Sequence, residues 1–178
     1  MRFSPSSLPG VWVIDLELRQ DERGFFARTF CENEFAEQGL NTRWPQCNVS
    51  FTRKQGMIRG LHFQAEPKPE IKIVRCTAGA VFDVVVDVRR GSPTFGKWEG
   101  FDLAALNRRA VYIPGGFAHG FQCLEDNCEV YYQMSEVYFP ELARGLRWND
   151  SAVKVAWPIA EQFLSDRDKS LPLLAELS

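Results

Sequence analysis

Short runs in which apolar and polar residues alternate occur throughout the chain. Residues 71–76 (Ile-Lys-Ile-Val-Arg-Cys) alternate almost strictly, and residues 81–88 are rich in the β-branched side chains that strands favour. Gly, Pro and Asn separate these runs where turns are needed. The pattern predicts many short strands, at residues 11–18, 46–52, 57–64, 71–76, 81–88, 96–103, 110–113, 119–124, 128–135 and 153–157.

Helical periodicity is rare. Residues 32–38 predict a helix, because acidic side chains fill the first turn and Gly39 is placed to end it; a weaker helix is expected after Pro158. Evenly spaced strands with little helix are typical of a β-sandwich or barrel. We therefore predict an all-β jelly roll with short peripheral helices. We expect it to form a single domain over residues 1–178 and to enclose a cavity whose walls are alternate strand residues.

Composition indicates which binding partners and which cellular compartment to expect. The net charge of −2 and the pI of about 5.8 give no general attraction to nucleic acid or to anionic membranes. Five cysteines without a Cys-x-x-Cys pair fit reduced thiols better than a disulfide framework or a zinc site. The N-terminus lacks a signal-peptide core, and no apolar stretch is long enough to span a bilayer. We expect a cytoplasmic protein that binds neither nucleic acid nor membrane.

The chain has only two histidines, His62 and His119. The spacing Pro114-x-Gly116-x-x-His119 matches the second signature of cupin-type jelly rolls, in which histidines and a carboxylate hold a metal. Without a third histidine, a two-histidine metal site would need Gln64 or Glu70, so we predict a cupin fold that does not need a metal. His119 is expected to be mainly a packed strand histidine, whereas His62, beside Gln64 on one strand face, is expected to lie in a site.

Spacing alone leaves undecided whether a lysine and two tyrosines belong to a site. Alternation places Lys72 on the strand face opposite its isoleucine neighbours, and so either in the cavity or in solvent. Tyr132 and Tyr138 are core residues by default, but a tyrosine in a cavity can also act as a general acid or as a wall for a ring. Judged from its own sequence alone, the polar loop at residues 165–168 is expected to carry solvated charges.

Taken in order, the motifs of nearly the whole chain resemble the dTDP-4-dehydrorhamnose 3,5-epimerase family of deoxysugar biosynthesis. They include Asp-Glu-Arg-Gly-Phe-Phe, Arg-Gly-Leu-His-Phe-Gln and Ser-Pro-Thr-Phe-Gly. The matching segments are residues 21–26, 46–50, 59–64, 72–76, 82–84, 92–96, 113–121, 148–150 and 164–168.

The resemblance implies a role for each matching position. His62 matches the catalytic base, Asp168 the carboxylate that orients it, and Tyr132 the acid on the opposite face of the sugar. Lys72 matches the residue that supports an enolate, and Tyr138 an aromatic residue near the sugar. The reaction implied is metal-independent epimerisation at C3 and C5 of a nucleotide-linked 4-keto-6-deoxyhexose, which is expected to need no cofactor.

The resemblance also implies a nucleotide-binding set and a homodimer of jelly rolls. Arg23 and Phe26 would reach across to the partner's site, and His119 is counted with the substrate-binding candidates. The nucleotide-binding residues are Arg23, Phe26, Gln46, Asn48 and Arg59, and the full set of substrate-binding candidates adds Arg28, His119 and Tyr138.

Arg28 departs from the family pattern, which commonly has a glutamate at this position. A glutamate can accept the N3–H of thymine, whereas an arginine can donate to the N3 of cytosine. The carrier is therefore expected to be dTDP or CDP. The alternative activities are epimerisation at C3 only, ketoisomerisation by the same base and acid, and a metal-dependent cupin dioxygenase that uses both histidines.

Overall fold

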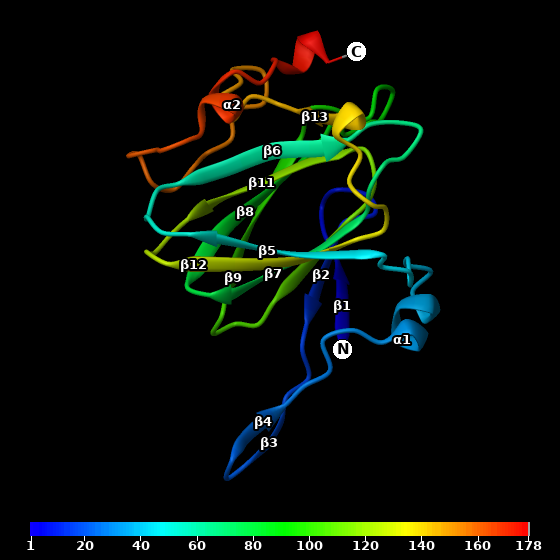
Figure 1. Cartoon of the computed structure of the whole chain (residues 1–178). Helices are drawn as coiled ribbons and strands as arrows, with labels where there is room; N and C mark the ends of the chain where they lie inside the picture. Colours follow the sequence, from blue (N-terminus) through cyan, green and yellow to red (C-terminus); the bar gives the residue numbers. More distant parts are fainter. Residues whose placement is uncertain (178) are drawn as a thin grey trace.

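Two antiparallel β-sheets face each other in the computed structural model, which describes residues 1–177 (Figure 1). In one sheet the order is β1 (Arg2–Pro5), β2 (Trp12–Asp15), β10 (Ala110–Ile113), β7 (Lys72–Ala78), β12 (Cys128–Met134) and β5 (Gln46–Thr52). In the other it is β13 (Ala143–Gly145), β6 (Ile58–Gln64), β11 (Phe117–Cys123), β8 (Ala80–Asp87) and β9 (Trp98–Ala104). The predicted all-β jelly roll is confirmed.

An apolar cluster fills much of the space between the sheets. Val74 and Val130 project inward from the six-stranded sheet, and Val85 and Phe121 project inward from the five-stranded sheet. The three valines are fully buried and Phe121 nearly so. Each buried side chain of this size contributes about 1.5–3 kcal/mol relative to an exposed one. The cluster therefore fixes how far apart the sheets lie and which way each strand faces.

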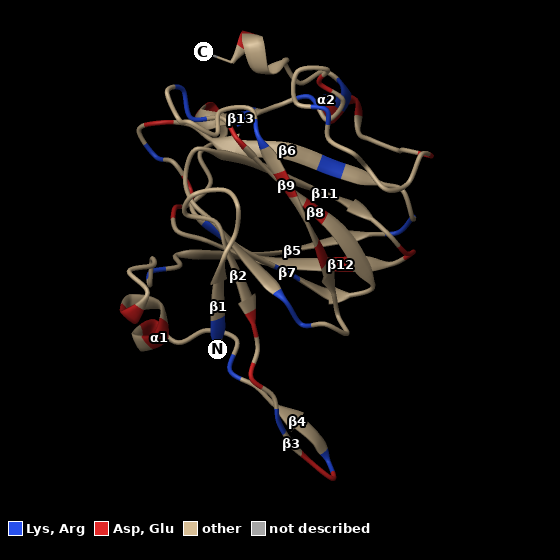
Figure 2. Ribbon diagram, turned by 180° about the vertical axis from the view of Figure 1, so that it is seen from behind, with Lys and Arg blue, Asp and Glu red and all other residues tan. Residues whose placement is uncertain are grey.

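The outer face of each sheet carries a second layer. Helix α1 (Glu32–Glu37) packs Phe35 against Tyr112 of the six-stranded sheet and against Trp44, which precedes β5. The C-terminal segment covers the five-stranded sheet through Val153 and Leu174, among others. Figure 2 shows acidic residues on α1, and Figure 1 shows the C-terminal segment beside β6. These layers explain why so many outward-facing strand residues are apolar.

The helix prediction was right for the first helix and wrong for the second. Helix α1 ends close to Gly39, which has a φ of +68°. No helix follows Pro158 directly. Instead α2 (Asp166–Lys169) starts at the capping residue Ser165, and short 3-10 helices occur at Pro140–Leu142 and Leu174–Glu176. None of the helices in residues 1–177 is long and apolar enough to cross a membrane.

The predicted strand at residues 153–157 is also wrong. These residues form no strand, because Val153, Val155 and Trp157 pack as an irregular segment on the outer face of the five-stranded sheet. Four short strands were not predicted: β1, β13 and the hairpin of β3 (Arg19–Asp21) and β4 (Gly24–Phe26). Every hairpin residue is exposed, so no alternating burial marks it.

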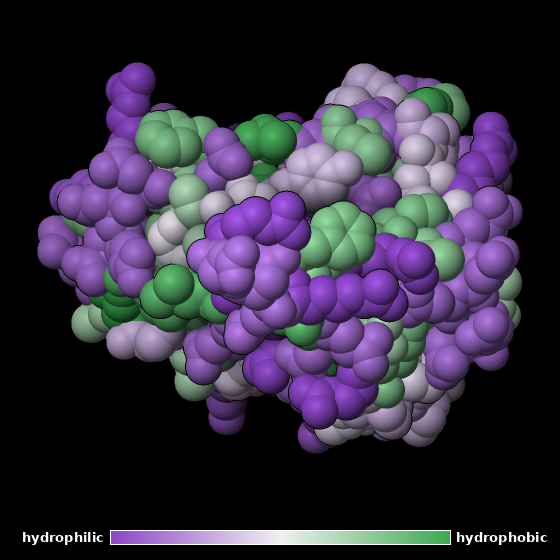
Figure 3. All heavy atoms as spheres, turned by 90° about the horizontal axis from the view of Figure 1, so that it is seen from below, coloured by the Kyte–Doolittle hydropathy of each residue, from purple (hydrophilic) through white to green (hydrophobic). Residues whose placement is uncertain are grey.

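The β3–β4 hairpin projects away from the sandwich (Figure 1). Phe26 is 68% exposed, and the Arg108 guanidinium lies 4.2 Å from the centre of the Phe25 ring. Figure 3 shows the end of the molecule from which the hairpin projects, where hydrophobic side chains lie between hydrophilic ones. The hairpin thus carries apolar side chains that its own chain leaves uncovered.

Strands β6 and β11 approach each other closely at two glycines. A Cβ on Gly60 would lie 2.6 Å from the Cα of Gly120, a separation that real side chains do not tolerate. The pairing register shifts between His119 and Phe121, and His62 lies directly opposite His119. The shift breaks simple alternation, so Arg59 and His62, three residues apart, both line the cavity.

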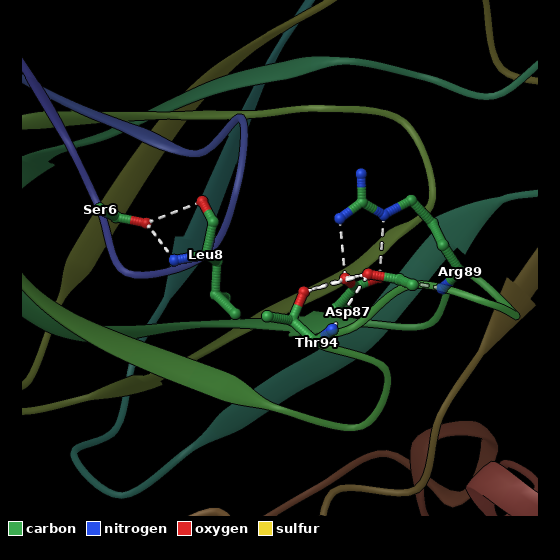
Figure 4. A network of polar contacts seen from close by, with 6 residues as sticks. Ser6, Leu8, Asp87, Arg89 and Thr94 are labelled. Carbon is green, nitrogen blue, oxygen red and sulfur yellow. Dashed lines mark hydrogen bonds and ion pairs between the residues drawn. The ribbon is translucent and has the colours of Figure 1, made fainter.

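Asp87 organises the loop between β8 and β9 (Figure 4). Its carboxylate, fully buried, accepts hydrogen bonds from the Arg89 guanidinium (2.7 and 2.9 Å), Ser92 Oγ (2.6 Å) and Thr94 Oγ1 (2.6 Å). Burial by itself would raise the pKa of Asp87, but these donors outweigh it and lower the pKa to about 2. In the same view, Ser6 closes the turn that brings Leu8 into the core.

We expect Asp87→Asn to lower the free energy of unfolding by about 1–3 kcal/mol near neutral pH, because Arg89 loses its charged acceptor. Urea denaturation measures this, and Asp102→Asn, at an exposed position of β9, is the control. Because the folded pKa lies below the ordinary value, the stabilisation is present above about pH 4 and is lost as the pH falls towards about 2. The free energies of unfolding of Asp87→Asn and of the wild type should therefore converge in acid. A difference that stays constant with pH would contradict the role assigned to Asp87.

Candidate active site

A cavity of about 450 Å³ opens between the two sheets beside the apolar core. The six-stranded sheet contributes one wall, through β5, β7 and β12, and the five-stranded sheet contributes the other, through β6 and β11. Segments 138–144 and 167–168 complete the rim. Polar side chains with apolar neighbours line it: Gln46, Asn48, Ser50, Arg59, His62, Phe63, Gln64, Glu70, Lys72, His119, Phe121, Tyr132, Met134, Tyr138, Arg144, Arg167 and Asp168.

His62 and Asp168 form a close pair on the five-stranded side. Asp168 Oδ1 lies 2.7 Å from His62 Nε2, and Oδ2 accepts a hydrogen bond from the backbone of Gly60. Burial raises the pKa of Asp168, but the hydrogen bonds from His62 and Gly60 outweigh it and lower the pKa. An ionised carboxylate can only accept, so Nε2 carries the proton and Nδ1 is the basic nitrogen.

Ser165 positions Asp168 by capping helix α2. Ser165 Oγ accepts from the backbone N–H of Asp168 at 3.1 Å, which fixes the first turn of the helix. Asp168 is 5% exposed, whereas Asp166 in the same helix has a fully exposed side chain. The helix thus delivers one carboxylate to the cavity and leaves the other in solvent.

His119 pairs with a different carboxylate. Its Nε2 lies 2.7 Å from Asp83 Oδ2, and the other oxygen, Oδ1, is buried without a hydrogen-bond partner among residues 1–177. Burial raises the pKa of Asp83, and the neighbouring His119 and Lys72 partly oppose this. His119 is buried yet lines the cavity, so both the structural and the substrate-contact predictions for it remain compatible with its position.

Lys72 points into the cavity, where it forms an ion pair with Glu70. Spacing alone left the cavity and solvent as alternatives. The neighbouring Ile73 packs on the outer face of the sheet beneath α1, so alternation turns Lys72 inward. Burial lowers the pKa of Lys72, and Glu70 opposes this.

Tyr132 lies on β12, on the wall that faces β6 and β11. It is opposite Asn48 of β5 in the pairing register, while the adjacent Tyr131 is opposite Val49, which is exposed on the outer face. Burial raises the pKa of Tyr132, as does the negative charge of Glu70. The phenol is therefore held in its protonated form.

Several polar side chains of the cavity are held in place by hydrogen bonds within the chain. Gln46 accepts from the backbone N–H of Tyr138 at 2.9 Å and donates to Asn48. Arg59 donates to Thr52 Oγ1 and to the carbonyl of Phe51, which orients its guanidinium. All four predicted residues, Gln46, Asn48, Arg59 and Tyr138, line the cavity.

Three predicted binding residues lie elsewhere, two in the β3–β4 hairpin and one just after it. Arg23 is paired with Asp21, Phe26 is exposed, and Arg28 forms an ion pair of 2.6 Å with Glu34 of α1. Within the described chain none of them lines the cavity. The predictions that Arg23 and Phe26 serve a partner's site and that Arg28 contacts the nucleobase therefore remain predictions.

Sequence reasoning missed several lining residues. Ser50 could have been found, because it alternates with Gln46 and Asn48 along β5. Glu70 precedes β7, and Arg144 and Arg167 lie outside alternating segments, so no periodic signal marked them. Among residues 1–177, no group of three or more His, Cys, Asp or Glu side chains is arranged to hold a metal ion.

Comparison with known proteins gives a consistent picture. The family model described as dTDP-4-dehydrorhamnose 3,5-epimerase matches residues 5–176. The dTDP-4-dehydrorhamnose 3,5-epimerase of Methanothermobacter thermautotrophicus is 44% identical, with coverage of 98% of this chain and 95% of the relative. A dTDP-4-dehydrorhamnose 3-epimerase of Streptomyces niveus is 42% identical, with coverage of 99% and 85%.

A solved structure agrees with these matches. It is the dTDP-6-deoxy-D-glucose-3,5-epimerase of Legionella pneumophila in complex with dTDP-4-keto-L-rhamnose, which superposes with a TM-score of 0.94. That protein is 36% identical, and the alignment covers 99% of this chain and 94% of the other. The likeness therefore extends over the whole jelly roll.

Proposed function

The chain belongs to the dTDP-4-dehydrorhamnose 3,5-epimerase family, and we propose that it epimerises a dTDP-linked 4-keto-6-deoxyhexose at C3 and C5. It is accordingly an isomerase. We further propose that the single jelly-roll domain carries the whole reaction. We place this reaction in the cytoplasm, since all five cysteines are free thiols.

The chemistry requires only proton transfer. In a 4-keto sugar both C3–H and C5–H lie next to the carbonyl, so a base can remove either proton to form an enolate. Inversion follows when the proton returns to the carbon from the opposite face of the ring. Proton removal and return complete the reaction, so a redox cofactor or a metal has no step to perform in this scheme.

The placement of His62 and Tyr132 on opposite walls carries the proposal. His62 comes from the five-stranded sheet and Tyr132 from the six-stranded sheet, so a sugar ring between them would meet a base on one face and a donor on the other. Asp168 holds the His62 ring through Nε2 and leaves Nδ1 to take the proton. Acid–base catalysis of this kind contributes about 10²–10⁴-fold.

Lys72 and the rim residues complete the proposed site. The Lys72 ammonium lies on the same wall as Tyr132 and would stabilise the negative charge that develops on O4 of the enolate. Arg59 suits the diphosphate, because its guanidinium is already oriented by Thr52 and Phe51. Gln46 and Asn48 would contact the nucleotide, and Tyr138 and His119 the sugar.

The exposed hairpin supports a homodimer. Phe25 and Phe26 are 46% and 68% exposed on it, and Val49 and Phe51 are 59% and 49% exposed on the outer face of edge strand β5. A second copy that covers these side chains would bring Arg23 and Phe26 towards the partner's cavity. The cavity as it stands holds few cations beyond Arg59 and the rim arginines, so a further arginine would assist diphosphate binding.

Epimerisation at C3 alone is the second candidate, since the 42% identical Streptomyces relative is a 3-epimerase. Ketoisomerisation would use the same base and acid, and product analysis distinguishes it. A metal-dependent dioxygenase has less support, because each histidine is already engaged by a carboxylate. Near-stoichiometric metal in the purified protein would revive that alternative.

We expect wild-type enzyme with dTDP-4-keto-6-deoxyglucose in D₂O to incorporate deuterium at both C3 and C5, as read by NMR. Exchange at C3 alone would establish the monoepimerase. His62→Ala should lose exchange at both carbons, by about 10²-fold or more. Tyr132→Phe should still exchange, because the base remains, but invert little. Tyr131→Phe, on the other face of β12, is the matched control.

The dimer predicts complementation between defective subunits. A mixed dimer of His62→Ala and Arg23→Ala/Phe26→Ala subunits contains one intact site, made from one subunit's cavity and the other's hairpin. Purified through two different tags, it should regain about half of the wild-type activity. A mixed dimer of His62→Ala and Asp168→Ala should regain none, because both defects lie in the cavity. Absence of recovery in the first mixture would disprove the shared site.

Calorimetry with dTDP, UDP, CDP and GDP tests the carrier. Glu34 holds the Arg28 guanidinium at α1, which leaves it poorly placed to donate to cytosine. We therefore expect dTDP to bind about tenfold tighter than CDP, a discrimination of the size that one lost base contact produces. Equal or tighter binding of CDP would instead support the CDP-sugar alternative.

A further inference from the structure

Glu70 is a buried carboxylate in the cavity to which the mechanism above gives no role. Its Oε1 contacts Lys72 Nζ directly, and the two side chains are only 7% and 10% exposed. Both line the same cavity as Tyr132. We propose that Glu70 is a positioning residue that holds the Lys72 ammonium protonated and directed into the cavity, and thereby sets the alkaline limit of the reaction. This inference rests on the proposed function.

The ion pair follows from where the strand places the two residues. Lys72 is the first residue of β7, and its inward direction is fixed by Val74 in the core and Ile73 on the outer face. An ammonium group buried without a partner is destabilised relative to the neutral amine and tends to lose its proton. Burial does lower the pKa of Lys72, and Glu70 is the strongest opposing influence.

The other groups around Lys72 do not replace Glu70. From β8, Asp83 also favours the protonated lysine, but more weakly, and its carboxylate is bonded to His119 of β11. Tyr132 of β12 is neutral when protonated, so it contributes no charge. Glu70 is therefore the carboxylate on which the charge of Lys72 chiefly depends.

Glu70 acts on the proposed acid as well. Its negative charge adds to burial in raising the pKa of Tyr132, whereas Arg59 works in the opposite direction. One carboxylate thus keeps two proton donors of the cavity, the ammonium of Lys72 and the phenol of Tyr132, in their protonated forms. Without it, both groups would lose their protons at lower pH.

The first test reads Lys72 directly and needs no substrate. The chain has six lysines, so ¹³C-lysine labelling gives few Cε signals, and Lys72→Arg assigns the relevant one. In Glu70→Gln the midpoint of the Lys72 titration should fall by about one pH unit or more. In Glu70→Asp, which keeps the carboxylate, the Lys72 midpoint should fall less. An unchanged midpoint in Glu70→Gln overturns the proposal.

Two further variants serve as comparisons. Glu136→Gln removes the carboxylate of a half-exposed pair with Lys68, 3.9 Å long, and should leave the Lys72 midpoint unchanged. Asp83→Asn removes the second carboxylate near Lys72. A larger shift in Asp83→Asn than in Glu70→Gln would overturn the assignment to Glu70, and a smaller one supports it.

The second test is the pH profile of kcat/KM, whose limbs report groups of the free enzyme. For Glu70→Gln, the ratio of kcat/KM at about pH 9 to that at about pH 7 should fall about tenfold relative to wild type. A loss equal at every pH would indicate a merely structural role and overturn the proposal. If wild-type protein converts no dTDP-sugar, the proposed function fails, while the lysine titration still decides the role of Glu70.

Discussion

The apolar cluster between the two sheets is the constraint on which the site depends. It fills one part of the interior with Val74, Val85 and Val130 and leaves the other part open. Because these residues fix the phase of their strands, the same strands turn Lys72 and Tyr132 towards the open part. A one-residue slip of β7 would exchange Lys72 with Ile73 and leave an isoleucine at the cavity wall. Packing and chemistry are therefore set by one register.

The cavity concentrates opposite charges, and their pairing explains the protonation of each. Asp168 is ionised because donors surround it, whereas Asp83 has one oxygen without a donor and is harder to ionise. His62 and His119 face each other across neighbouring strands, yet each bonds a separate carboxylate. Two histidines that begin as equivalents in the sequence thus have different exposure: one opens to the cavity and the other is buried.

Local patterns predicted the fold well where burial alternates. Residues 46–52 and 110–113 coincide with β5 and β10, because their side chains alternate or are wholly buried. The hairpin and β13 escaped detection because they are three-residue strands with little burial. The site was harder to predict from the sequence, because His62 and Asp168 are 106 residues apart and no short motif contains both. Only the family resemblance paired them, and neither it nor spacing revealed that Glu70 meets Lys72.

The hairpin has a consequence for how this enzyme can diverge. Its residues are exposed, so substitutions at Arg23, Phe26 or Arg28 disturb no buried contact in their own chain. The groups assigned to chemistry instead stand on strands whose packing tolerates little change. Under the proposed dimer, mutation of the hairpin would change how the partner's site holds its nucleotide while the core that positions His62 and Tyr132 is preserved, so nucleotide binding would be able to evolve separately from proton transfer.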